Sequence, residues 1–199
     1  MSRDFSGEHP VNFLLRFQRA VLGRARGLVF QQLGFFAKGT GRRLFFGPGV
    51  RFQNSRLVRL GEGVAFGNNA RIECFAGKTK NLKGPKLRIG PGTTFGDGTH
   101  LGCINDIEIG QDVLFGSYVL IVDHSHGQPR SDLGAESIVA PRLRPILSKA
   151  IVRIGDKAWI GDGVVILPGA QIGEGAIIGA NAVVRSVVEA RTIYLGDFT

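Results

Sequence analysis

The sequence predicts an all-β fold, a left-handed parallel β-helix of short strands, preceded by a short helical segment. Two observations support this prediction. Large aliphatic or aromatic residues recur every six positions over most of the chain, and glycine follows them far more often than chance allows. A period of six fits neither an α-helix nor a simple alternating strand, so it indicates a short strand and a turn in every repeat.

The period is clearest near the C-terminus, where steps of six from Ile154 meet a β-branched aliphatic residue every time. The residue four positions after each of these is small or β-branched. Seventeen positions fit the template: Phe46, Phe52, Leu60, Phe66, Ile72, Ile89, Phe95, Leu101, Ile109, Phe115, Ile121, Ile154, Ile160, Ile166, Ile172, Ile178 and Val184. Glycine follows twelve of the seventeen, whereas the 30 glycines scattered at random would do so about two or three times.

Each repeat is expected to place one large side chain inward and one small side chain at a corner. Glycine after the inward residue lets neighbouring turns stack closely. Three such faces close a triangular coil of 18 residues, and each coil pairs its backbone with the next. The core is then a column of stacked side chains that is stable only when several coils cover one another.

Extra residues are expected to interrupt the coils at one corner. The whole coils are 40–57, 60–77, 89–106, 109–126, 154–171 and 172–189. Insertions of two residues fall at 58–59 and 107–108, and longer ones at 78–88 and 127–153. Loops stacked along one edge of a solenoid commonly build its binding surface. The expected organisation is an N-terminal segment, 1–43, a β-helix domain, 44–190, and a tail, 191–199.

The N-terminal segment is basic and predicted to be helical over 10–37. It contributes +6 of the formal net charge of +9. Phe13, Phe17, Val21 and Leu28 follow helical spacing and would form one apolar stripe. The stripe either covers the open end of the first coil or rests on an anionic membrane surface. We favour the cap, with peripheral contact to the inner membrane surface as a second role.

Composition excludes several classes of protein. No run of 18 apolar residues exists that could span a membrane, and arginines interrupt the apolar N-terminal stretch as they would not in a signal peptide. Cys74 and Cys103 form no disulfide framework and are expected to pack as small apolar residues, so a cytoplasmic location is expected. Nucleic-acid binding would rest on charge alone, because no recognition motif is present.

Two stretches carry a resemblance to a known family. They are IGQDVLFGSYVLIVDHSH at 109–126 and IGDKAWIGDGVVILPGAQIGEGAIIGANAVV at 154–184. Together with the repeats over 44–188, they resemble the hexapeptide-repeat acyltransferases, in particular the maltose, galactoside and polysaccharide O-acetyltransferase branch. The resemblance implies a homotrimer with sites between subunits, acetyl-CoA as co-substrate, and a saccharide hydroxyl as acceptor. It implies direct transfer with a histidine general base, and no metal.

The resemblance also implies which residues form the site. A count without gaps from Phe115 places His126 where the family carries its base, with His124 as the alternative and Asp123 as the partner that holds the imidazole tautomer. The coenzyme A positions are Trp159, Gly161, Asp162, Gly179, Ala180, Arg185 and Ser186. The family's acceptor-binding asparagine falls at Gly96, so Asp97 beside it and Asp106 are the candidate acceptor contacts.

Other activities are known on this fold. An N-acetyltransferase acting on a nucleotide-activated amino sugar would use the same base. A γ-type carbonic anhydrase would need three imidazoles around zinc, and only His100, His124 and His126 are available in the coils. A scaffold without catalysis is a further alternative, because a fold alone proves no activity.

Overall fold

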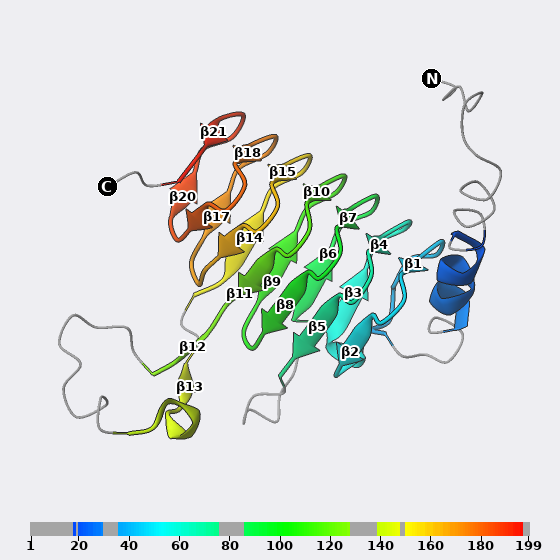
Figure 1. Ribbon diagram of the computed structural model, residues 1–199, viewed down its shortest axis with the longest axis horizontal. Helices are drawn as coiled ribbons and strands as arrows, with labels where there is room; N and C mark the ends of the chain where they lie inside the picture. Colours follow the sequence, from blue (N-terminus) through cyan, green and yellow to red (C-terminus); the bar gives the residue numbers. More distant parts are fainter. Residues whose placement is uncertain are drawn as a thin grey trace.

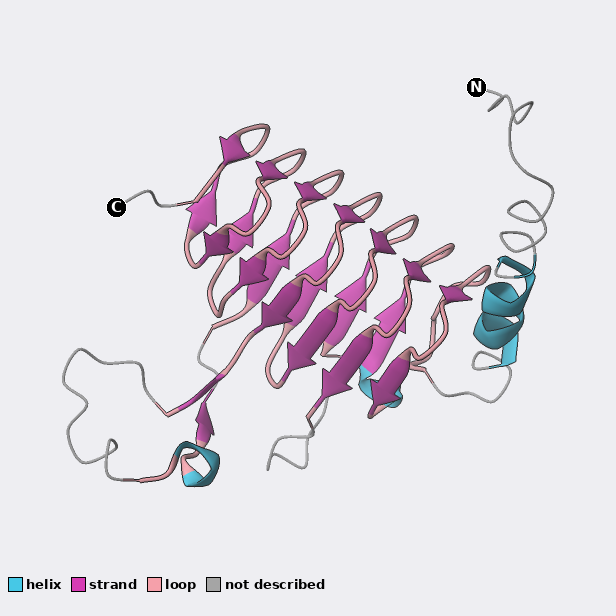
Figure 2. Cartoon of the chain, in the orientation of Figure 1, coloured by secondary structure: helices cyan, strands magenta, loops and turns pink. Residues whose placement is uncertain are grey.

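The computed structural model describes residues 18, 20–29, 36–75, 86–127, 139–147 and 150–196. It is a left-handed parallel β-helix, in which strands from successive coils stack in parallel register into three faces (Figures 1 and 2). A helix over residues 20–29 lies at the N-terminal end of the stack. No helix within these described ranges is long and apolar enough to cross a membrane.

The three faces follow one another along the chain in every coil. Face A contains β1 (Phe45–Phe46), β4 (Ala65–Phe66), β7 (Thr94–Phe95), β10 (Leu114–Phe115), β15 (Trp159–Ile160), β18 (Ile177–Ile178) and β21 (Ile193–Tyr194). Face B contains β2 (Arg51–Gln53), β5 (Arg71–Cys74), β8 (His100–Cys103), β11 (Leu120–Val122), β16 (Val165–Ile166) and β19 (Val183–Val184). Face C contains β3 (Val58–Leu60), β6 (Leu87–Ile89), β9 (Ile107–Ile109), β14 (Val152–Ile154), β17 (Gln171–Ile172) and β20 (Val187–Val188).

Shorter elements lie at the edge between faces B and C, which we call the B–C edge. The 3-10 helix η1 (Ser55–Leu57) joins β2 to β3. The strands β12 (Ser125–His126) and β13 (Ile146–Leu147) form an antiparallel pair that leaves the prism after β11, and η3 (Pro141–Leu143) lies between them in the chain. Residues 76–85 and 128–138, which lie outside the described residues, come between a face B strand and a face C strand in the sequence. Of the predicted insertion 127–153, the described strand β13 therefore lies at the expected edge.

The core is the predicted column of inward side chains, and all seventeen repeat starts except Phe52 are buried. In the early coils of face A the column is aromatic. The ring centroids of Phe66 and Phe95 lie 4.5 Å apart, and those of Phe95 and Phe115 lie 4.4 Å apart, with nearly parallel planes. Stacked rings fill face A in the early coils, and Ile160 and Ile178 continue the column in the later coils.

Coil length differs from the expected constant 18. Trp159 pairs with Ile177, eighteen residues on, but Phe45 pairs with Ala65, twenty residues on, and Ile177 pairs with Ile193, sixteen residues on. The early coils are longer because each face C strand buries two side chains, as Ile107 and Ile109 do. The predicted insertions at 58–59 and 107–108, and the ends of those at 78–88 and 127–153, are therefore strand residues.

The last coil also extends further than expected. β21 lies inside the predicted tail, 191–199, and pairs with β18, so the solenoid continues to Tyr194. Val188 is buried in face C, four residues after the inward Val184 of face B, which shortens the final turn.

The N-terminal helix approaches the first coil through glycine. A Cβ atom on Gly23 would lie 2.1 Å from a ring carbon of Phe45, and one on Gly27 would lie 2.2 Å from the carbonyl oxygen of Leu44. Val21 and Leu28 are instead 49% and 56% exposed. The prediction that these two residues face the coil is wrong, because close packing of the helix requires glycine there. Phe13 and Phe17 lie outside the described residues.

Candidate active site at the B–C edge

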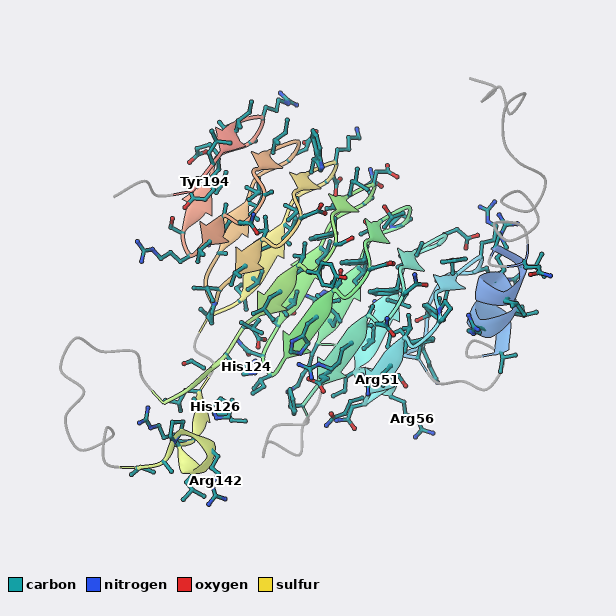
Figure 3. All side chains as sticks on the ribbon, viewed as in Figure 1. Arg51, Arg56, His124, His126, Arg142 and Tyr194 are labelled. Carbon is teal, nitrogen blue, oxygen red and sulfur yellow. The ribbon has the colours of Figure 1, made fainter. Side chains whose placement is uncertain are left out.

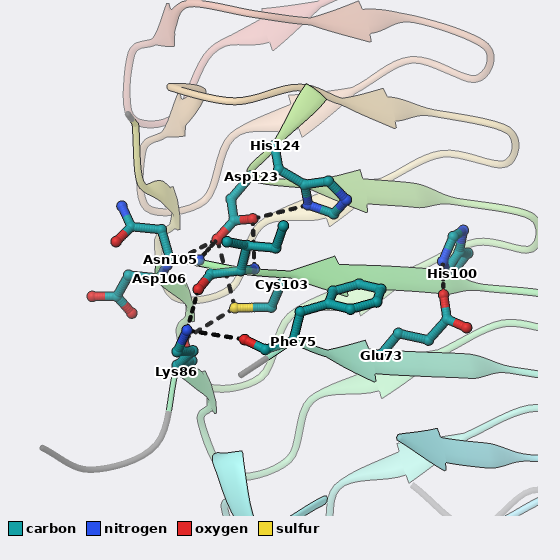
Figure 4. A network of polar contacts seen from close by, with 10 residues as sticks. Glu73, Phe75, Lys86, His100, Cys103, Asn105, Asp106, Asp123 and His124 are labelled. Atoms are coloured by element: carbon teal, nitrogen blue, oxygen red, sulfur yellow. Dashed lines mark hydrogen bonds and ion pairs between the residues drawn. The ribbon is translucent and has the colours of Figure 1, made fainter. Parts of the chain in front are cut away.

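A buried carboxylate organises the B–C edge at the level of β8 and β11. Asp123 is fully buried, and its oxygens accept hydrogen bonds from the main-chain N–H groups of Ile104 (2.8 Å), Asn105 (2.7 Å) and Asp106 (2.8 Å) (Figure 4). These groups form the turn between β8 and β9. One side chain therefore ties the turn of one coil to the end of the strand in the next.

The charge of Asp123 is stabilised in place. Burial alone would raise the pKa of this carboxyl group, but the hydrogen bonds from His124 and the three main-chain N–H groups outweigh burial and lower its pKa below the ordinary value. Its contacts join the predicted imidazole partner, His124, to the turn at 104–106.

His124 is held against the prism. Its Nδ1 lies 3.2 Å from Oδ1 of Asp123, and its ring meets that of Phe75 edge-on with centroids 5.7 Å apart. A Cβ atom on Gly102 would lie 3.0 Å from Cε1 of His124, so the imidazole lies over a position without a side chain. Only 13% of the His124 side chain is exposed.

His126 is placed differently. It lies in β12, outside the stack of coils, where it pairs with Ile146 of β13, and it is exposed (Figure 3). The prediction that a regular coil continues to residue 126 is wrong. Asp123 is the last inward residue, and Ser125 donates a hydrogen bond from Oγ to the carbonyl oxygen of Gly127, 2.8 Å away.

A third histidine lies on face B with both ring nitrogens engaged. His100 contacts Arg71 through Nδ1 and Glu73 through Nε2, each at 3.0 Å. Arg71 can only donate, so Nδ1 accepts and Nε2 donates to the carboxylate. Burial lowers the pKa of His100, and the hydrogen bond to Glu73 opposes that shift.

This arrangement argues against the zinc alternative. His100 has no ring nitrogen left for a metal, because Arg71 and Glu73 occupy both. Within the described ranges, no group of three or more His, Cys, Asp or Glu side chains gathers as metal ligands would.

The two cysteines are structural. Cys74 and Cys103 are buried, free and paired in the ladder between β5 and β8. A hydrogen bond with Cys74 and burial raise the pKa of the Cys103 thiol, so it stays protonated and poorly nucleophilic. The expectation that both pack as small apolar residues is confirmed.

The positions predicted for coenzyme A are divided between two edges. Trp159, Gly161, Asp162, Gly179 and Ala180 lie together along the edge between faces A and B, the A–B edge. Arg185 and Ser186 follow β19 and lie on the B–C edge, where both are exposed. On face B, Ile121 pairs with Ile166, and Ile166 pairs with Val184. Arg185 therefore lies two strand spacings, or about 10 Å, along the stack from the end of β11.

The A–B edge explains several of these residues by packing. Oδ1 of Asp162 accepts a hydrogen bond from the main-chain N–H of Ser117 at 2.6 Å, so this carboxylate links successive corners. A Cβ atom on Gly161 would lie 2.7 Å from the main-chain nitrogen of Ala180. Trp159 differs, because its side chain is 54% exposed and free to contact a ligand.

The two predicted acceptor contacts are engaged elsewhere. Asp97 lies on the A–B edge and accepts hydrogen bonds from the main-chain N–H and side-chain amide of Asn68 at 2.7 and 3.0 Å. Asp106 is at the correct edge but forms an ion pair with Arg88 at 2.8 Å. The structure does not bring these two carboxylates together.

Comparison with known proteins agrees with this architecture. Residues 151–186 match the family model described as bacterial transferase hexapeptide (six repeats). WbbJ of Escherichia coli (strain K12) is described as a proposed lipopolysaccharide biosynthesis O-acetyl transferase. It is 32% identical to this chain over 145 residues, which cover 72% of this chain and 70% of WbbJ. The chain belongs to the hexapeptide-repeat acyltransferase family. It is an acyltransferase.

A second relative of this hexapeptide-repeat acyltransferase and a solved structure of similar fold were also found. The bifunctional protein GlmU of Xylella fastidiosa (strain 9a5c) is 31% identical over 124 residues, which cover 61% of this chain and 26% of GlmU. The crystal structure of AntD, an N-acyltransferase from Bacillus cereus in complex with dTDP and 3-hydroxybutyryl-CoA, superposes with a TM-score of 0.67 at 18% identity, covering 84% of this chain and 81% of that chain. The likeness to AntD supports the fold.

Sequence reasoning missed part of the surface of this acyltransferase beside His124. Arg71, Glu73 and Phe75 come from β5 and its end, and they meet His100 and His124 on or beside face B. Their alternation along β5, with Ile72 and Cys74 buried between them, was a usable signal that all three point outward.

Proposed function

We propose that this acyltransferase transfers an acetyl group from acetyl-CoA to a hydroxyl group of a sugar or polysaccharide precursor. The observation that carries the proposal is an exposed histidine, His126, at the edge where the inserted segments emerge, in a chain of this family. A sugar hydroxyl is a weak nucleophile until a base removes its proton, and histidine is the side chain that most often serves as that base.

The reaction needs one base and no covalent enzyme intermediate. His126 removes the hydroxyl proton as the oxygen attacks the thioester carbonyl carbon, and a C–O bond forms. The tetrahedral intermediate then collapses, the C–S bond breaks, and the proton passes to the leaving sulfur. The products are an acetyl ester and the free thiol of coenzyme A.

We assign Asp123 and His124 a positioning role in this mechanism. Asp123 holds the turn at 104–106 and the His124 ring together, so the direction in which the chain leaves β11 is constrained. His126 follows two residues later. An alternative is that His124 itself is the base, and its contact with Asp123 favours this alternative because such a pair sets the imidazole tautomer. We prefer His126 because His124 is largely enclosed.

For the donor, we propose that acetyl-CoA lies along the late coils, with Trp159 and the A–B edge on one side and Arg185 and Ser186 near its phosphates. Small residues at Gly179 and Ala180 let an extended pantetheine chain lie close to the backbone. Arginine suits phosphate because its planar guanidinium group presents several fixed donors. The donor requirement also places the reaction in the cytoplasm, where acetyl-CoA is available.

The donor and acceptor residues lie on two edges of one prism, so we propose that neighbouring subunits of a homotrimer complete each site. Exposed apolar side chains in the late coils support burial against other copies: Leu114 (52%), Trp159 (54%), Val187 (59%) and Ile193 (68%). Closed cyclic symmetry is the usual way to bury such a surface.

Light scattering after gel filtration is expected to show a particle of about three times the chain mass of 21.4 kDa. Activity per chain should fall on dilution in step with the loss of this species, since the site needs two subunits. A stable monomer with full activity would contradict a shared site.

The activity itself is tested by measuring free thiol released from acetyl-CoA in the presence of free, nucleotide-linked and polymer-derived sugars. We expect thiol release to depend on an acceptor that bears a free hydroxyl. An amino sugar that is acetylated on nitrogen, with no ester formed on any sugar in the panel, would instead support the N-acetyltransferase alternative. The same base serves either acceptor.

A further inference from the structure

The helix over residues 20–29 has two opposite faces. One face carries Gly23 and Gly27, which contact Phe45 and Leu44 of the first coil. Side chains larger than hydrogen would collide there, so this face and the position of the helix against the prism are constrained. The helix therefore presents its other side away from the coils.

The outward face is apolar and exposed. It consists of residues that helical spacing places within an arc of about 120°, since successive residues turn by about 100°. Its large members are Val21 (49% exposed), Leu22 (54%), Leu28 (56%) and Val29 (52%), and Ala25 between them is also exposed. We call this surface the helix patch.

Arginines border the helix patch on both sides. Helical spacing places Arg24 just outside one limit of the apolar arc and Arg26 just outside the other. An apolar arc between two cationic margins is typical of a helix that lies in the plane of a membrane surface, with its apolar side in the acyl region and its arginines at the headgroups.

The charge of the whole N-terminal end fits the same partner. Residues 1–61 contain eleven Lys and Arg residues and two acidic residues, Asp4 and Glu8. Arg51 and Arg56 of the first coil are exposed at the end of the prism that carries the helix (Figure 3). Cationic side chains near an anionic leaflet each add to binding.

We propose that the helix patch and the basic first coil dock on an anionic lipid surface. A second copy of the chain fits this end less well, because two surfaces with the same positive charge would repel. A nucleic acid would use the arginines but leave the exposed leucines and valines unsatisfied. A lipid surface satisfies both the charge and the apolar arc.

Docking of this kind would place the reaction near the membrane. β10 lies in the same coil as β11, after which His126 leaves the prism, and it is three coil steps from β1, or about 14 Å along the stack. That distance suits a saccharide attached to a lipid, an implication that rests on the proposed function. The docking itself does not, and its test uses no substrate.

The test is co-sedimentation of the full-length protein with vesicles of phosphatidylglycerol and phosphatidylcholine, compared with phosphatidylcholine alone. We expect binding to the anionic vesicles that weakens as salt is raised, because the charge contribution is screened. The double substitution Leu22→Gln and Val29→Gln should reduce the bound fraction at least tenfold. The melting temperature should not change, since both side chains are exposed.

The matched control is Val139→Gln with Leu143→Gln. Leu143 is 65% exposed and lies between Arg142 and Arg144, so it has similar local charge on a different part of the surface. This variant should bind vesicles as the wild type does. The proposal is overturned if the wild type fails to bind anionic vesicles at low salt, or if the helix variant binds as well as the control. It is also overturned if the helix variant changes the molar mass, which would make the patch a contact between copies.

Discussion

Replacing His126 with alanine is expected to lower kcat by roughly 10²–10⁴-fold, the scale on which a general base contributes. Its side chain is exposed in β12, so the melting temperature should stay at the wild-type value. The measurement is steady-state thiol release from acetyl-CoA with a competent acceptor, together with thermal unfolding of the same preparations. Coenzyme A binding should persist, because the donor residues lie elsewhere.

His124→Ala is the matched comparison, two residues away. It removes a ring packed on Phe75 and Gly102 and one hydrogen bond to Asp123, so we expect a lower melting temperature and a smaller loss of kcat than for His126→Ala. The reverse result, an active His126→Ala and an inactive His124→Ala, would assign the base to the imidazole that Asp123 holds. Two fully active variants would contradict histidine base catalysis.

Asp123→Ala is expected to have the largest effect on stability. It leaves three partly buried main-chain N–H groups and the His124 imidazole without their acceptor, which is itself fully buried. Loss of such a buried anion with several donors costs roughly 3–5 kcal/mol of the free energy of unfolding. Urea unfolding followed by circular dichroism measures this change. The control is Asp156→Ala, because Asp156 is partly exposed and accepts one main-chain hydrogen bond, from Gln111.

The same carboxylate predicts the direction of the pH dependence. The pKa of Asp123 is lowered in the folded protein, so its ionisation contributes stability above its unfolded pKa of about 3.9. That contribution is lost as the pH falls through the lower, folded-state pKa. The wild type should therefore lose stability more steeply than Asp123→Ala on acidification. Equal stability of Asp123→Ala and Asp156→Ala at neutral pH would show that the hydrogen bonds of Asp123 do not hold the edge.

Most of the fold could be predicted because every coil repeats the same arrangement of inward side chains. An inward aliphatic residue and a small corner residue recur every six positions, and β12 and β13 leave the prism at the edge where the longest insertion is expected. The variable coil length was harder to predict. A hexad count treats Ile107 as an insertion, although it is a second inward residue of a face C strand.

The candidate site was predictable in its residue types and less so in its geometry. The spacing placed Asp123, His124 and His126 at an edge, but a count by position could not show that Asp123 takes an inward place. Charged side chains are seldom inward, and this one is stable there because a turn from the preceding coil supplies its hydrogen bonds. Such contacts between coils leave no local pattern in the sequence.

Two glycines in the N-terminal helix were a sequence signal for the side of the helix that contacts the first coil. Gly23 and Gly27 are four residues apart, which is the spacing of one helical face. Glycine lowers the stability of an isolated helix, so by helix propensity alone these two residues disfavour a helix in this segment. In the structure their small size permits contact with Leu44 and Phe45, and the larger apolar residues remain outside.

The measurement that tests the central proposal most directly is the identity of the product. The purified protein is incubated with isotopically labelled acetyl-CoA and the responsive saccharide, and the saccharide is analysed by mass spectrometry before and after hydroxylamine treatment. We expect one labelled acetyl group on the sugar, removed by hydroxylamine as an ester is, and no label on the protein. Label held covalently by the protein, or an acetyl group on the sugar that resists hydroxylamine as an amide does, would contradict direct O-acetyl transfer.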